Sequence, residues 1–103
     1  LDPVIHPLVR RHPVTKKPSL FLSPHTMVKI VDYDYDKGRK LLEKLIEHSI
    51  QSKYVYEHIW SNDDIVMWDN RCTMHSVKPF DNNIIKRIMH RVTLVGDKEP
   101  VKA

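Results

Sequence analysis

The sequence predicts a mainly β protein with one covering helix. Three observations carry this prediction: short apolar segments bounded by proline or polar residues open the chain, one later stretch repeats leucine and isoleucine at helical spacing, and further alternating segments follow it. The connections between the segments are too short for repeated βαβ crossovers, which favours antiparallel pairing. With 103 residues, the chain is predicted to form a single unit, residues 1–103.

Extended segments are predicted at residues 8–12, 19–22 and 27–31. Residues 13–18, between the first two, begin and end with proline, which fixes φ and disfavours helix in the residue before it. We therefore expect the first two segments to pair as a hairpin.

One amphipathic helix is predicted after these segments. Apolar residues recur there every three to five positions while charged residues fill the other positions; the apolar set is Leu41, Leu42, Leu45, Ile46 and Ile50. Asp34 is a suitable N-cap, Asp36 adds negative charge to the first turn, and Gly38 weakens the early helix without forbidding it.

After the helix, apolar and polar residues alternate again, as is typical of strands. Residues 54–60 and 64–68 are predicted strands joined by a tight turn at Ser61-Asn62-Asp63. A last extended run covers residues 84–95 and ends at Gly96. We expect Trp60, Ile65, Met67 and Trp68 to be buried together with the leucines and Ile46 of the helix.

Composition excludes several classes of function. No segment approaches the roughly 18 consecutive apolar residues of a membrane-spanning helix. The 17 Lys and Arg exceed the 13 Asp and Glu by only four and are scattered among carboxylates, unlike the basic stripe of a nucleic-acid surface. One cysteine, Cys72, rules out an internal disulfide framework and favours a reducing compartment, so we expect a cytoplasmic protein. From the apolar runs and the charge pattern we expect neither membrane nor nucleic-acid partners.

The last predicted strand carries two arginines on one face. Arg87 and Arg91 are four residues apart, so in a strand they project from the same side with Cα atoms roughly 13 Å apart. The planar fork of arginine holds carboxylate or sulfonate oxygens with two hydrogen bonds. On spacing alone, an ordinary solvated face explains the pair as well.

His75 follows a strongly apolar segment. A histidine at a strand end suits a metal ion or general-base chemistry, although isolated histidines more often serve as hydrogen-bonded or surface residues. The other histidines show no metal-ligand spacing.

Taken together, these residues resemble a known pattern. The run Trp68-Asp69-Asn70-Arg71, then His75, then residues 87–97 are similar to the C-terminal signature of the taurine dioxygenase family of Fe(II)- and 2-oxoglutarate-dependent oxygenases. The opening motifs at residues 6–13 and 17–22 also resemble the family in order and spacing. The likeness covers nearly the whole chain.

The resemblance implies a fold and a site. The fold is a double-stranded β-helix, or jelly roll, with helices outside, of which this chain would be the C-terminal portion. His75 would be the distal histidine of the 2-His-1-carboxylate triad that holds Fe(II). Arg87 would bind the far carboxylate of 2-oxoglutarate, and Arg91 would bind an anionic substrate.

The resemblance also implies the chemistry of the parent enzyme. With Fe(II), 2-oxoglutarate and O2, it would hydroxylate a small anionic sulfonate, sulfate ester or carboxylate and release succinate and CO2. No His-x-Asp or His-x-Glu occurs in the sequence, so we expect the chain alone to be inactive and to begin within a longer gene product. Residues 23–26 lack the aromatic of taurine-using relatives, which disfavours taurine.

We expect the parent enzyme to be a homo-oligomer. The alternative function is a non-catalytic module for anion binding or assembly, in which a basic pocket recognises a carboxylate-bearing ligand or a partner chain.

Overall fold

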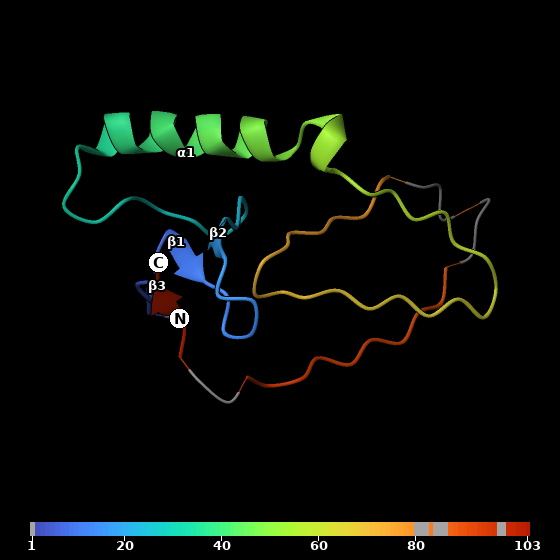
Figure 1. Cartoon of the computed structure of the whole chain (residues 1–103). Coiled ribbons are helices and arrows are strands. Elements are labelled where there is room, and N and C mark those ends of the chain that lie inside the picture. The colour runs from blue at the N-terminus through green and yellow to red at the C-terminus, as the bar shows by residue number, and fades with distance from the viewer. Residues whose placement is uncertain (1, 80–82, 84–86, 97–98) are drawn as a thin grey trace. The chain divides into compact units, whose positions relative to one another are not determined.

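The computed structural model describes residues 2–79, 83, 87–96 and 99–103. Its regular elements are strand β1 (Val9–Arg11), strand β2 (Pro18–Leu20), helix α1 (Tyr35–Ser49), a 3-10 turn (Ser52–Tyr54) and strand β3 (Val101–Lys102) (Figure 1). The chain divides into two compact units, one of Leu1–Phe21 with Asn70–Ala103 and the other of Leu22–Asp69. In the described part, no helix is long and apolar enough to span a membrane.

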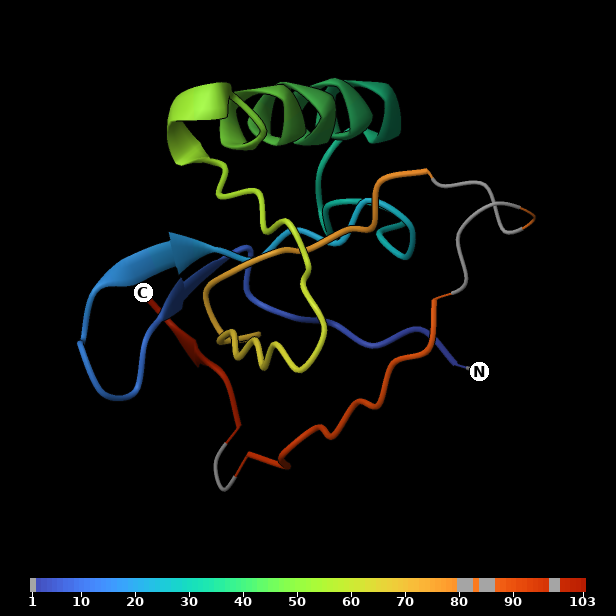
Figure 2. The same ribbon diagram turned by 90° about the vertical axis from the view of Figure 1, so that its right-hand side faces the viewer.

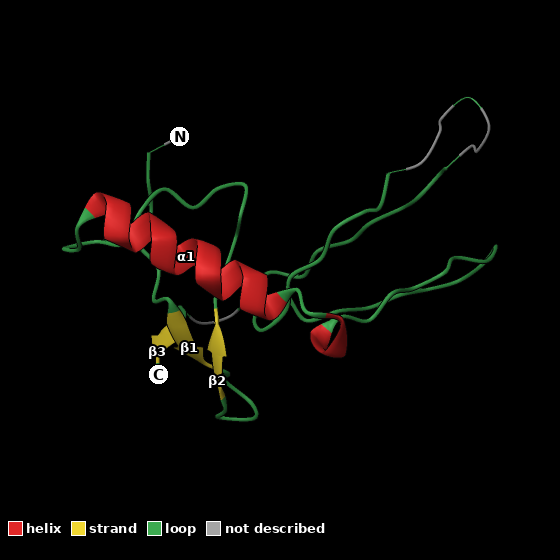
Figure 3. Cartoon of the chain, turned by 90° about the horizontal axis from the view of Figure 1, so that it is seen from above, coloured by secondary structure: helices red, strands yellow, loops and turns green. Residues whose placement is uncertain are grey.

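The first unit contains a small antiparallel sheet with strand order β2-β1-β3 (Figure 3). The register pairs Val9 with Leu20 and Arg10 with Ser19, which confirms the predicted hairpin (Figure 2). On its other side β1 pairs with β3, with Arg10 opposite Lys102. Strand β3 could not be predicted from the sequence, because two residues are too few to show an alternation of apolar and polar side chains.

The turn of the hairpin is organised by His12. The Nδ1 atom of this buried side chain accepts hydrogen bonds from the backbone N–H groups of Val14 and Thr15, each at 3.1 Å. The backbone of His12 adds two more bonds, donating to Lys17 and accepting from Lys16, both at 2.9 Å. Lys16 adopts a left-handed conformation with φ of 63°, which closes the loop.

Helix α1 confirms the predicted helix and its cap. The Asp34 carboxylate accepts a hydrogen bond from the Lys37 backbone N–H at 3.0 Å, and Asp36 lies in the first turn. Leu42 is 3% exposed, whereas Leu41 is 37% exposed at the margin of the apolar stripe. Leu42, in the predicted apolar stripe, is thus buried.

The predicted strand at residues 27–31 does not form. The carbonyl oxygens of Met27 and Val28 each accept a hydrogen bond from Arg39 of α1 at 3.1 Å. These carbonyls are therefore satisfied by a helix side chain and not by a neighbouring strand.

Strand structure is also missing from the later alternating segments. Residues 54–60, 64–68 and 87–95 contain no strand, although the turn at residues 61–63 is present, and residues 84–86 lie outside the described part. Figure 1 draws these described stretches as extended loops. Without neighbours to complete a hydrogen-bonded ladder, an alternating sequence has no sheet to join.

The side chains of these stretches correct the predicted core. Ile65 and Met67 are 93% and 91% exposed, and Trp60 and Trp68 are also exposed. Leu94 and Val95 of the last stretch are 89% and 96% exposed. The reason is the same as for the missing strands, because an apolar strand face is buried only when another layer covers it.

Gly38 gives a test of the helix. A Cβ added there would lie 3.5 Å from side-chain carbons of Ile30 and Tyr33, which is ordinary van der Waals contact. Because glycine costs about 0.8–1 kcal/mol relative to alanine inside a helix, Gly38→Ala should raise the free energy of unfolding by about 0.5–1 kcal/mol. Urea denaturation followed by helical circular dichroism measures this change.

The matched control for Gly38→Ala is Gly96→Ala, at a position outside any helix or strand. Both substitutions reduce the conformational freedom of the unfolded chain equally. The difference between their effects on the free energy of unfolding therefore isolates the stabilisation of the folded helix. A destabilised Gly38→Ala variant would show that the contact with Ile30 and Tyr33 does not accommodate a methyl group.

Candidate functional site

His75 lies in the first unit, in an exposed stretch without regular secondary structure. Within the described ranges it belongs to no group of three side chains that could hold a metal ion. One imidazole offers Fe(II) a single ligand, whereas the facial triad needs three. His75 alone therefore does not supply the three ligands of such a triad.

Arg87 and Arg91 lie in the exposed stretch 87–96 of the same unit, and Arg87 interacts with another residue. This stretch is not a strand in the described structure, and the common face of the two arginines stays a prediction. Their projection to one side depends on the strict alternation of a strand. The prediction that both line one pocket stays a prediction.

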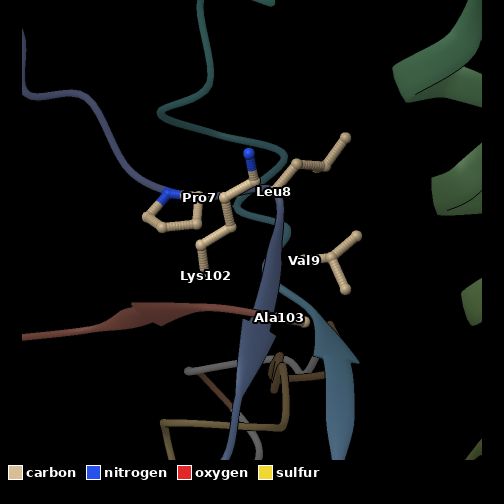
Figure 4. A pocket seen from close by; sticks show the side chains of 5 residues that line it. All are labelled: Pro7, Leu8, Val9, Lys102 and Ala103. Atoms are coloured by element: carbon tan, nitrogen blue, oxygen red, sulfur yellow. The ribbon is translucent and has the colours of Figure 1, made fainter.

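A shallow pocket lies beside β1 and β3 in the first unit (Figure 4). Its lining is mostly apolar, and the residues concerned are Pro7, Leu8, Val9, Lys102 and Ala103. None of the three predicted site residues lines it. The pocket therefore gives no support to the predicted binding role of Arg87 or Arg91.

A hydrogen-bonded cluster in the second unit surrounds His58. Its Nε2 atom lies 3.1 Å from Oδ2 of Asp64, and its Nδ1 atom lies 3.3 Å from the Tyr56 hydroxyl. Asp64 also accepts a hydrogen bond from the Ser61 backbone N–H at 2.9 Å. Trp60 meets the His58 ring edge to face, with centroids 4.7 Å apart.

The same contacts set the ionisation of Asp64. The hydrogen bond from Ser61 has the largest effect and lowers the pKa of the Asp64 carboxyl below its ordinary value. Desolvation opposes this effect, and the hydrogen bond and charge of His58 lower the pKa by smaller amounts. This cluster was not predicted from the sequence. A histidine and an acid on the two sides of a predicted turn are the signal that could have revealed it.

Comparison with known proteins identifies the chain. The model of the taurine catabolism dioxygenase TauD, TfdA family matches residues 2–93. The chain belongs to this family.

Relatives in the TauD, TfdA family agree with the assignment. The chain is 38% identical over 96 residues to the alpha-ketoglutarate-dependent 2,4-dichlorophenoxyacetate dioxygenase of Burkholderia sp. (strain RASC), covering 93% of the chain and 32% of that enzyme. It is 36% identical to an (S)-phenoxypropionate/alpha-ketoglutarate-dioxygenase of Delftia acidovorans, covering 92% and 32% of the two chains. It is also 36% identical to the pentalenolactone F synthase of Streptomyces arenae, covering 90% and 31%.

The comparisons confirm the predicted resemblance to this family. As that resemblance implied, two of these relatives are named as alpha-ketoglutarate-dependent dioxygenases, which are oxidoreductases. The chain spans about a third of the length of the curated relatives that it matches. No solved structure matches it significantly. The family implies a jelly roll, and the described structure itself contains a three-stranded antiparallel sheet and one long helix.

The lowered pKa of Asp64 predicts how the turn at residues 61–64 responds to acid. A carboxylate with a depressed pKa stabilises the folded state above its unfolded pKa, and this contribution disappears as pH falls through the folded pKa. The Ser61 N–H should therefore stay hydrogen-bonded through the ordinary Asp range and be released only at lower pH. The amide chemical shift of Ser61, followed by NMR against pH, measures this release.

The control for the acid titration is Asp64→Asn, in which the low-pH step at the Ser61 amide should vanish while the turn remains. A Ser61 amide that titrates at the ordinary pKa of aspartate in the unsubstituted chain would contradict the assignment of Asp64 as its ionised acceptor.

Proposed function

We propose that the chain forms the C-terminal part of a dioxygenase domain that uses Fe(II), 2-oxoglutarate and O2. The observation that carries the proposal is the family match over residues 2–93. In support, the chain covers a third of each named relative, and its later alternating segments expose apolar side chains that a larger jelly roll would cover. Bound Fe(II) would supply the activation of O2.

Each predicted site residue has a separate role in the proposal. His75 would donate one ligand to the metal, and the remaining ligands would come from outside the described residues. Arg87 would hold the far carboxylate of 2-oxoglutarate with two charge-assisted hydrogen bonds. Arg91 would orient the anionic primary substrate. Formation of a strand at residues 87–95 would bring both guanidinium groups to one face.

A small organic carboxylate is the substrate class that we favour. Two of the relatives are named for 2,4-dichlorophenoxyacetate and (S)-phenoxypropionate, which are both carboxylates. None of the three relatives described above is named for taurine, in keeping with the absence of the aromatic residue from positions 23–26. The product of hydroxylation would be accompanied by succinate and CO2.

Oligomerisation of the parent enzyme remains part of the proposal. Side chains such as Ile65, Met67 and Leu94 are almost fully exposed in this chain, and burying them against further polypeptide is favourable. A second copy and the rest of the dioxygenase domain are both able to supply that cover.

The proposed roles predict how a chimera should behave. The chimera replaces the 96 matched residues of the Burkholderia relative with the corresponding residues of this chain. Arg87→Ala should weaken 2-oxoglutarate binding by about 2–5 kcal/mol, or roughly 30-fold and more, because a bound carboxylate loses its charged partner. Arg87→Lys should restore it only in part, since an ammonium group lacks the planar fork. Anaerobic titration of the Fe(II) protein measures the affinity.

The controls separate the proposed roles from general effects. Arg91→Ala should raise the KM for the carboxylate substrate and leave 2-oxoglutarate affinity near normal, whereas Arg11→Ala, at an exposed position of β1, should change neither. Cosubstrate affinity that stays within about 0.5 kcal/mol in Arg87→Ala would instead indicate a solvated surface residue. A folded chimera that binds carboxylates without forming succinate would favour the non-catalytic module.

A further inference from the structure

A cationic side chain on the β1–β2 hairpin has no acidic partner among the residues that the structure describes. The guanidinium carbon of Arg10 lies 3.4 Å from the centroid of the Phe21 ring. Its Nη2 atom lies 3.3 Å from Nδ1 of His6, and the His6 ring meets Phe21 edge to face with centroids 5.3 Å apart. An aromatic face and an imidazole thus surround the positive charge, and neither neutralises it.

Two polar atoms beside this cluster are buried without a hydrogen-bond partner in the described structure, Nε of Arg10 and Oγ of Ser19. The β1–β2 register makes Arg10 and Ser19 direct cross-strand partners. Directly opposed residues of an antiparallel pair project from the same face with their Cβ atoms about 5 Å apart. The unsatisfied N–H and hydroxyl therefore belong to one site.

The chemistry of this site defines what would complete it. A guanidinium has only donors, and a serine hydroxyl is able to donate as well, so a ligand that satisfies both must be an acceptor. Burial lowers the pKa of Arg10, which means that the surroundings disfavour its charge, and a negative ligand would offset that effect. A carboxylate supplies two acceptor oxygens and one negative charge in a geometry that matches the arginine fork.

We propose that the β1–β2 hairpin binds a carboxylate between the Arg10 guanidinium and the Ser19 hydroxyl, with Phe21 and His6 holding the guanidinium in place. Because Nε and Oγ are buried, the carboxylate enters when the side chains that cover them shift aside. The carboxylate comes either from an acidic side chain of a polypeptide or from a free organic acid. The site uses none of His75, Arg87 and Arg91, so it goes beyond the proposed oxygenase function.

NMR of the isotopically labelled chain tests the proposal, with the Nε–H resonance of Arg10 as the readout. Sodium acetate is titrated against sodium chloride at equal ionic strength. We expect a saturable shift with acetate and none with chloride. Ser19→Ala should bind acetate about fivefold more weakly, through the loss of one hydrogen bond. The absence of a saturable, acetate-specific shift in the unsubstituted chain would overturn the proposal, whatever the variants do.

Variants establish where the carboxylate binds. In Arg10→Gln, the acetate-dependent shifts of neighbouring β1 and β2 amides should disappear, and their survival would overturn the proposal. Arg10→Lys keeps the charge and should retain weak binding. The matched control is Arg11→Gln, the neighbouring arginine on the opposite face of β1, which should bind acetate as the unsubstituted chain does. Loss of binding in Arg87→Gln alone would place the carboxylate at the proposed cosubstrate site and overturn the hairpin site.

Two further ligands distinguish the sources of the carboxylate. Succinate represents a free organic acid, and a short peptide with a single glutamate represents an acidic side chain. Tighter binding of the peptide assigns the site to a polypeptide partner, and tighter binding of succinate assigns it to a small acid.

Discussion

Completion of a β-ladder is the constraint on which most of this structure depends. A strand needs a neighbour for its backbone hydrogen bonds and a second layer for its apolar face. The β1–β2 hairpin satisfies the first need locally, because its partners are separated only by a short turn. The stretches at 54–60, 64–68 and 87–95 satisfy neither need, and they remain extended with apolar side chains such as Ile65 and Val95 exposed.

The parts of the fold that local interactions determine could be predicted from the sequence. The hairpin followed from two prolines between apolar segments, and the helix followed from its leucine spacing and the Asp34 cap. Elements that depend on distant partners could not be predicted in this way. Residues 27–31 have the composition of a strand, yet the carbonyls of Met27 and Val28 bind Arg39, twelve and eleven residues away along the chain.

The site shows the same division between local and distant information. The order of motifs around His75 and Arg91 was enough to predict the family, which the comparisons confirm. The geometry of that site was not predictable from spacing, because the common face of Arg87 and Arg91 presupposes a strand that the described structure lacks. The Arg10 site was missed for a related reason, since its members meet only through the cross-strand register of Arg10 and Ser19.

We propose that residues 87–95 become a strand, and present Arg87 and Arg91 together, when the rest of a dioxygenase domain supplies neighbouring strands. Amide hydrogen exchange of residues 88–95, measured in this chain and in the chimera with the Burkholderia relative, tests that claim most directly. Exchange should be rapid in the isolated chain and strongly slowed in the chimera at the amides that pair with the neighbouring strands. Equal exchange in the two proteins, whether rapid or slow, would contradict it.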